Sequence, residues 1–216
     1  MRRFVLLVHR VPRDGAFTLN DLAGGAGRMD EVARVVSTAL TVSNDLRRDT
    51  EVVLLLGGDA GAVLQGRRIV VRGDRVRYLN PDERSTAALL KNALVAAVGH
   101  PRDFEAHRGI VVGPADPLEE LARYAATDKA VWLTEDGPRA PDGLPLPPPE
   151  TFLLSDPYDP TPAEQEVLRA SGVRSLALGS RSLRASQVVD VVQFLVDRCA
   201  ERAPAVTGPE GPPGVP

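Results

Sequence analysis

The sequence has a single cysteine, Cys199, among 216 residues, which excludes an internal disulfide and a zinc site built from several cysteines. Its three histidines, His9, His100 and His107, lie far apart and show none of the spacings of a metal-binding motif. We therefore expect no metal, and a protein of the reducing cytoplasm.

Long hydrophobic runs and an excess of positive charge are also missing. The longest apolar stretches fall far short of the roughly 20 residues that a membrane-spanning helix needs. The apolar residues 4–8 are too few for the core of a signal peptide, about 7 to 15 residues, and fit a first β-strand. The net charge of −3 argues against a protein that coats nucleic acid, although residues 1–90 carry 14 arginines against 11 acidic residues.

Apolar runs of strand length alternate with segments of helical periodicity. The runs cover residues 4–8, 52–56, 110–112, 130–133, 151–154 and 174–178, and a helix is predicted over 28–42. This alternation predicts an α/β fold with a mostly parallel sheet and helices on both faces, in one domain over residues 1–202. We further expect an inserted hairpin over about 62–79 that turns at Gly73-Asp74, a stiff loop over 137–149 and a disordered tail over 203–216.

Three segments share one arrangement of helix-starting residues. They are Asn80-Pro81-Asp82-Glu83, Asp116-Pro117-Leu118-Glu119 and Thr161-Pro162-Ala163-Glu164. Each offers a capping side chain, then a proline for the first turn, then a glutamate at the third helical position. We therefore expect a helix to begin at each of them.

Three predicted strands end in small or polar residues. Leu133-Thr134, Ser155-Asp156 and the segment from Gly179 to Ser182 each follow an apolar run. Ligands of parallel sheets bind beyond the carboxyl ends of the strands, so these ends indicate one pocket, with ordinary strand-to-helix turns as the alternative. The glycine-rich segment "LGGDAGAVLQG" has neither the dinucleotide nor the P-loop spacing.

Longer stretches of the chain resemble one enzyme family. "NDLAGGAGRMDEVARVVSTALTVSNDLRRDTEVVLLL", "NPDERSTAALLKNAL", "FLLSD" and "LALGSRSLRASQVV" occur in the order found in the tRNA pseudouridine N1-methyltransferases, the archaeal-type enzymes and their bacterial relatives in the SPOUT superfamily. The resemblance covers about residues 1–198. It implies a C-terminal deep trefoil knot, a homodimer, S-adenosylmethionine (AdoMet) as cofactor, and methylation of N1 of pseudouridine 54 in the tRNA T-loop.

The resemblance also places the cofactor. Carried over position by position, the cofactor-binding residues are Leu133, Leu154, Ser155, Asp156, Leu178, Gly179, Leu183, Ser186 and Val188. Small residues around Gly179 would let the backbone approach the adenine and ribose, and the leucines would form an apolar slot. Many family members carry glycine at Ser155, histidine at Pro157 and a His-Cys pair at Gln187-Val188. Bacterial relatives with "ASQ" in this loop indicate that AdoMet binding survives these changes.

For catalysis, we place Asp30 and Arg34 near the target uracil ring. They lie four residues apart in a predicted helix, so they share one face and can pair. A surface ion pair of little energetic weight is the alternative. The protein must hold N1 in line with the methyl group of AdoMet and assist the loss of the N1 proton.

Arginines are the expected contacts to tRNA, because the guanidinium fork suits phosphate. The candidates are Arg28, Arg47, Arg48 and Arg84, with the arginines of the predicted hairpin, Arg67, Arg68, Arg72, Arg75 and Arg77, and Tyr78 for stacking. Charges on an edge hairpin also prevent strand pairing between molecules, which is the alternative role. The rival to the whole interpretation is a knotted dimer that binds AdoMet or RNA but has another RNA target or no turnover.

Overall fold

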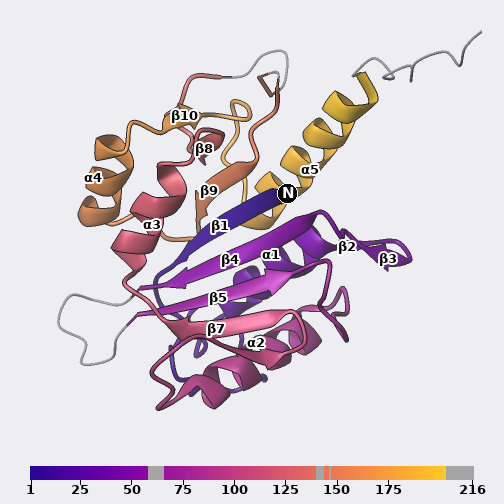
Figure 1. Cartoon of the computed structure of the whole chain (residues 1–216), viewed down its shortest axis with the longest axis vertical. Coiled ribbons are helices and arrows are strands. Elements are labelled where there is room, and N and C mark those ends of the chain that lie inside the picture. The colour runs from indigo at the N-terminus through magenta and orange to yellow at the C-terminus, as the bar shows by residue number, and fades with distance from the viewer. Residues whose placement is uncertain (58–65, 140–143, 146, 203–216) are drawn as a thin grey trace, which may run out of the picture.

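The computed structural model describes residues 1–57, 66–139, 144–145 and 147–202. Its centre is an eight-stranded sheet with the strand order β10-β8-β9-β1-β4-β5-β7-β6 (Figure 1). The parallel part consists of β10 (Arg174–Leu176), β8 (Ala130–Leu133), β9 (Thr151–Ser155), β1 (Arg2–Val8) and β4 (Thr50–Leu56). The antiparallel part consists of β5 (Arg67–Arg72), β7 (Ile110–Pro114) and β6 (Phe104–His107), so the predicted α/β fold is confirmed.

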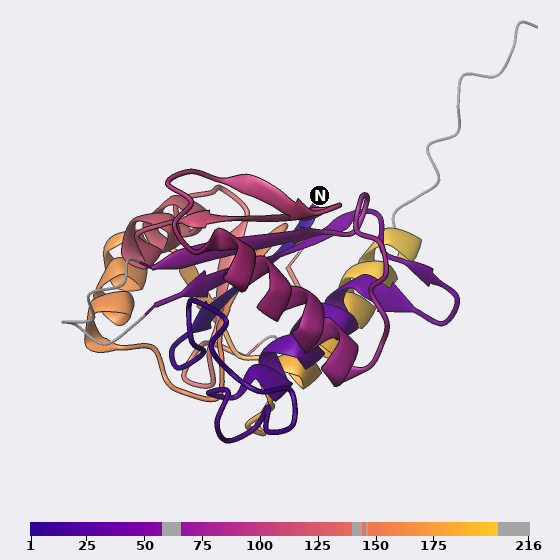
Figure 2. The ribbon, with the colours of Figure 1, turned by 90° about the horizontal axis from the view of Figure 1, so that it is seen from below.

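Helices cover both faces of the sheet (Figure 2). One face packs against α1 (Met29–Leu40), α2 (Glu83–Ala97) and α5 (Ala185–Arg202), and the other against α3 (Pro117–Ala125) and α4 (Pro162–Ala170). In β1, Phe4 and Leu6 join the first core, whereas Val5 and Leu7 join the second. Burial on both faces explains why the parallel strands are continuous apolar runs. In the described part of the chain, no helix combines the length and the apolar composition needed to span a membrane.

Two of the three predicted helix starts are confirmed, and the third begins later than predicted. Asp116 caps α3, and Thr161 and Glu164 form a reciprocal capping box at α4. At α2, however, the cap is Asp82 rather than Asn80, and its side chain accepts a hydrogen bond from a backbone N–H of the first turn. The segment contains two residues of similar capping strength, so the proline precedes the helix instead of opening it.

The predicted inserted hairpin is wrong. Residues 67–72 do form a strand, but β5 lies inside the main sheet, between β4 and β7, and no returning strand follows Gly73-Asp74 within the described residues. Ile69 and Val71 are fully buried, and this burial favours a place inside the sheet over a free edge. A small separate ribbon pairs β2 (Thr41–Val42) with β3 (Asp45–Leu46). The predicted tail, and residues 58–65, lie outside the described residues.

The first strand marks the point where the direction of strand addition reverses. β1 pairs in parallel with β4 on one side and with β9 on the other, and the chain reaches β9 only after completing the antiparallel half. At such a switch point, the connections leave the carboxyl ends of neighbouring strands toward opposite faces and open a crevice. The edge beyond β1, β9, β8 and β10 is therefore where the fold favours a ligand site.

Candidate active site

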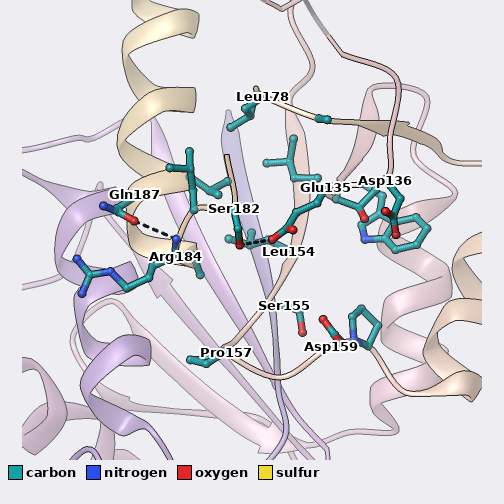
Figure 3. Close-up of a pocket in the computed structure, with 18 of the residues that line it drawn as sticks. Glu135, Asp136, Leu154, Ser155, Pro157, Asp159, Leu178, Ser182, Arg184 and Gln187 are labelled. Carbon is teal, nitrogen blue, oxygen red and sulfur yellow. Dashed lines mark hydrogen bonds between the residues drawn. The ribbon is translucent and has the colours of Figure 1, made fainter. Parts of the chain in front are cut away.

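A pocket of about 630 Å³ lies at this edge of the sheet (Figure 3). Its lining residues come from three segments, 132–136, 154–160 and 176–188, which follow the ends of β8, β9 and β10. We call it the cofactor pocket. The three strand ends that the sequence indicated thus meet at one cavity.

Most of the residues predicted to bind a cofactor line this pocket. They are Leu133, Leu154, Ser155, Asp156, Leu178, Gly179, Leu183 and Val188. Ser186 is the exception, because it is buried behind the wall, where its backbone N–H donates to the side chain of Glu31 at 2.8 Å. The leucines supply the apolar surface that an adenine ring needs, so the residues present fit the expected cofactor.

Gly179 has the open surroundings expected of a residue that a ligand approaches closely. It lines the pocket, and a Cβ added there would meet no atom of the described residues within 4 Å, apart from its neighbours in the chain. By contrast, a Cβ at Gly137, in the neighbouring loop, would lie 2.7 Å from the backbone N of Leu176. The free space at Gly179 therefore belongs to the pocket and not to protein packing.

The polar rim is mostly acidic. Glu135, Asp136 and Asp159 line the pocket together with Arg184 (Figure 3). Arg181 also lines it. Ser182 donates a hydrogen bond to the Glu135 carboxylate, which ties the third loop to the first. An acidic rim favours a ligand that carries positive charge, such as a sulfonium or an ammonium group.

A buried histidine lies beneath the second loop. His9 follows β1, and its Nδ1 lies 2.7 Å from Asp156 Oδ1 while its Nε2 lies 3.0 Å from Glu164 Oε2. Burial lowers the pKa of His9, but its hydrogen bonds and charge interactions with the two carboxylates outweigh this and raise the pKa to about 9. Sequence reasoning missed this residue, because it considered histidines only as metal ligands.

Tyr158 connects the second loop with the start of α1. Its ring lines the pocket, and the Arg10 guanidinium lies over the ring at 4.0 Å from the centroid. Arg28 is also close enough to interact with Tyr158 electrostatically. A planar aromatic–guanidinium pair of this kind can stack on a nucleic-acid base.

The predicted pair Asp30 and Arg34 exists and belongs to a larger cluster. Arg34 Nη2 lies 2.7 Å from Asp30 Oδ2, and Arg28 holds both oxygens of Asp30 at 2.9 and 3.0 Å. Arg28 adopts a left-handed conformation with φ 70°, which is uncommon for a residue other than glycine. Burial raises the pKa of Asp30, but the two arginines and a backbone N–H outweigh it and lower the pKa below its usual value.

The cluster lies beside the cofactor pocket. Arg34 also pairs with Glu31 at 3.1 Å and with Glu83 at 2.8 Å, and Glu31 accepts the hydrogen bond from Ser186 at the start of α5. The first turn of α1 therefore abuts the helix whose N-terminal residues line the pocket. The alternative, a solvated surface pair, does not describe Asp30, which is 8% exposed.

The arginines assigned to RNA fall into two groups. Arg28 and Arg84 belong to the region of the cluster, and Arg84 donates to the Leu19 carbonyl at 2.8 Å. Arg47 pairs with Asp197 at 2.8 Å, and Arg48 with Asp45 at 2.9 Å. Asp197 lies 12 residues beyond the start of α5 at Ala185, about 18 Å along the helix, so these two arginines lie far from the pocket.

Three of the other predicted arginines have structural partners. Arg68 of β5 pairs with Asp103 and with Glu120. Arg72 and Arg75 pair with Asp74 and Glu105, and Tyr78 is 84% exposed. In the part of the chain that the structure describes, no group of three or more histidine, cysteine or acidic side chains is arranged to hold a metal ion.

Sequence comparison gives the class of protein to which this fold and pocket belong. The chain belongs to a family described as "Putative SAM-dependent RNA methyltransferase", whose model matches residues 1–200. The tRNA (pseudouridine(54)-N(1))-methyltransferase of Methanocella arvoryzae is 40% identical over 92% of this chain and all of that protein. The enzyme of the same name from Haloferax volcanii is 37% identical over 91% of this chain and 96% of that protein.

A solved structure shows the same fold. Nep1 of Archaeoglobus fulgidus, bound to S-adenosylhomocysteine, superposes with a TM-score of 0.61 at 14% identity, over 93% of this chain and 99% of that one. The similarity supports the α/β arrangement described above.

Proposed function

We propose that this protein transfers the methyl group of AdoMet to N1 of pseudouridine 54 in the T-loop of tRNA. The observation that carries the proposal is the cofactor pocket at the carboxyl ends of β8, β9 and β10, in a chain 40% identical to an enzyme with that activity in its name. All of the predicted cofactor residues except Ser186 line this pocket, and its acidic rim suits a cationic ligand.

The residues of the pocket bind and orient the cofactor. Leu133, Leu178 and Leu183 would hold its adenine, next to the backbone at Gly179. Bound AdoMet supplies an electrophilic methyl group on its sulfonium. Holding N1 in line with that methyl group is the main task of the protein, because positioning can contribute about 7–11 kcal/mol to lowering the barrier.

Asp30 acts on the target base through Arg28 and Arg34, which it holds. The lowered pKa of Asp30 makes its carboxylate a weak proton acceptor, so we assign it the orientation of the two guanidinium groups that hold it. Arg28 and Arg34 then face the uracil, whose N1 develops negative charge as its proton leaves. The proton passes to solvent or to a group of modest basicity.

The wider assembly is part of the same proposal. The protein acts in the cytoplasm as a homodimer, and its C-terminal segment is threaded into a trefoil knot. Phe194 of α5 is 59% exposed, an apolar side chain on a helix that a partner subunit would cover. Of the arginines predicted to contact tRNA, Arg84 binds a phosphate and Arg28 faces the target base, whereas Arg47 and Arg48 are held in ion pairs away from the pocket.

Methyl-labelled AdoMet tests the activity on two T-loop stem RNAs that differ only in pseudouridine or uridine at the target position. We expect label only in the pseudouridine RNA, at N1. AdoMet binding without label in either RNA would replace the proposal with its rival, a dimer with another RNA target or without turnover. A protein that binds no AdoMet would refute the proposal and leave only a dimer that binds RNA.

A further inference from the structure

His9 lies between two carboxylates that come from different elements. Asp156 follows β9, and Glu164 lies in the first turn of α4. The side chain of His9 is 12% exposed, that of Asp156 is fully buried and that of Glu164 is 7% exposed. The two contacts, at 2.7 and 3.0 Å, are within hydrogen-bonding distance.

This geometry favours the protonated form of the imidazole. A neutral imidazole carries one N–H, so its other nitrogen would direct a lone pair at a carboxylate. The imidazolium donates to both carboxylates at once, and charge-assisted hydrogen bonds are stronger than neutral ones. The raised pKa of His9, about 9, agrees with this view.

The two carboxylates hold opposite ends of one pocket loop. Asp156 begins the loop: its backbone N–H donates to the Leu7 carbonyl at 2.9 Å, and its side chain accepts the N–H of Tyr158 at 3.0 Å. Glu164 holds the other end, because it accepts the N–H of Thr161 at 2.7 Å. Residues 156–160, which lie between these anchors, all line the cofactor pocket.

We propose that protonated His9 is a positioning residue for the cofactor: by holding both ends of the loop 156–161, it keeps that wall of the pocket in its binding conformation. The affinity for the cofactor then depends on the charge of His9. The inference rests on the proposed function, since it assumes that the pocket binds AdoMet.

Other charged and aromatic groups surround His9, but they have partners other than its imidazole. Arg10, its neighbour in the chain, lies over the ring of Tyr158. Tyr158 meets the imidazole edge-on, with 6.4 Å between the centroids. From α1, Arg28 interacts with Tyr158 and pairs with Asp30. Among these groups, only the two carboxylates hydrogen-bond the imidazole.

Calorimetric titration with S-adenosylhomocysteine between pH 7 and pH 10 tests the proposal on four proteins. They are the natural chain, His9→Gln, Glu164→Gln and the control His100→Gln, whose ring stacks on Phe104 of β6 at the far edge of the sheet. The ligand's amino group titrates in this range as well, so affinities are compared as ratios between proteins at one pH. Methyl transfer at saturating AdoMet and thermal unfolding are measured in parallel.

At pH 7, we expect His9→Gln to weaken binding about tenfold, from the loss of charge-assisted hydrogen bonds. The rate at saturating AdoMet should stay within about threefold of that of the natural chain, because His9 positions the loop and does not contact the reacting atoms. The ratio of the two dissociation constants, that of His9→Gln over that of the natural chain, should fall toward one as the pH passes about 9, where His9 loses its charge. Glutamine at position 164 can still form the capping box but no longer raises the pKa of His9. The affinity of Glu164→Gln should therefore fall at a lower pH than that of the natural chain.

Other results would overturn the proposal. Equal affinity of His9→Gln and the natural chain at pH 7, or a ratio that stays constant up to pH 10, would show that the charge of His9 does not support the pocket. An unchanged pH dependence in Glu164→Gln would do the same even if His9→Gln failed to fold. If the natural chain itself bound no S-adenosylhomocysteine, the proposed function would fail, and not this inference alone.

Discussion

The carboxylate of Glu31 accepts a hydrogen bond from the backbone N–H of Ser186 at 2.8 Å, and so joins the first turn of α1 to the start of α5. The side chain of Glu31 is completely buried and also holds Arg34 at 3.1 Å. The N-terminus of a helix carries unpaired N–H groups and partial positive charge, which a carboxylate satisfies. One buried glutamate thus connects the proposed catalytic cluster with the helix that closes the cofactor pocket.

Replacing Glu31 with glutamine should destabilise the protein. The amide can still accept from Ser186, but its NH₂ group then faces the guanidinium of Arg34, and a buried donor without an acceptor costs about 1–3 kcal/mol. The free energy of unfolding from urea titration checks this. Glu166→Gln removes an exposed ion pair with Arg169 and should change stability by less than about 0.5 kcal/mol. Equal effects of the two substitutions would contradict the role of Glu31.

Replacing Asp30 with asparagine should separate turnover from cofactor binding. The variant loses the charge that holds Arg28 and Arg34 in place, and misplacement of groups at a reacting centre can cost about 10²-fold in rate. The affinity for AdoMet should be unchanged, because Asp30 does not line the pocket. Single-turnover methylation of the T-loop RNA at saturating AdoMet measures the rate.

Asp45→Asn is the matched control for that experiment. Asp45 pairs with Arg48 in an exposed position far from the pocket, so its loss should leave the rate within about twofold. Undiminished turnover in Asp30→Asn would remove Asp30 from the catalytic cluster.

Gly179→Ala should weaken AdoMet binding without harm to the fold. The new methyl group would project into the pocket, where the proposed function places the cofactor against this backbone, and an overpacked contact costs about 1–3 kcal/mol, or roughly tenfold in affinity. Gly57→Ala is the control, because among the described residues its Cβ would meet only the Val8 carbonyl, at 3.9 Å, and Gly57 does not line the pocket. Calorimetry on both variants checks the difference; tight binding by Gly179→Ala would mean that the cofactor does not approach this backbone.

The position of the pocket could be predicted from the sequence, whereas its supporting contacts could not. Parallel strands end at one edge of the sheet, so the strand pattern alone assigns Leu133, Ser155 and Gly179 to one site. His9 and Asp156 lie 147 positions apart, and His9 and Glu164 lie 155 apart. Local spacing carries no signal for such contacts, because they arise only when β9 pairs with β1. The interior place of β5 was missed for the same reason, since its partner β7 lies beyond α2 in the sequence.

The stability of the protein should fall at alkaline pH because of His9. The pKa of this group is raised from 6.5 to about 9 in the folded state, so its contribution is fully present below pH 6.5 and is lost as the pH rises through about 9. The contribution is of the order of 3 kcal/mol. Urea unfolding at several pH values from 6 to 10 should show the decline in the natural chain and a smaller one in His9→Gln. Parallel declines in the two proteins would assign the effect to other groups.

Arg84 and Arg47 should differ in how their removal affects RNA binding. Arg84 donates hydrogen bonds to the Leu19 carbonyl and to Asn20. Among the described residues it has no acidic partner, so its positive charge is available for a phosphate. Removing an arginine that binds a phosphate weakens binding to every RNA sequence and lowers the salt slope by about one. Arg47 holds Asp197 with both Nη atoms, so Arg47→Ala leaves that carboxylate without one of its two arginine partners and should mainly reduce stability.

Binding of the T-loop stem, measured at several salt concentrations, distinguishes the two arginines. We expect Arg84→Ala to bind the RNA more weakly than the natural chain and with a shallower salt dependence. Folded Arg47→Ala should bind as the natural chain does, with weaker binding only under conditions where the variant is partly unfolded. Arg169→Ala, at an exposed position of α4 on the other face of the sheet, is the control and should bind as the natural chain does. Reduced affinity of folded Arg47→Ala, with unchanged binding by Arg84→Ala, would move the RNA surface from the catalytic cluster to the ribbon of β2 and β3.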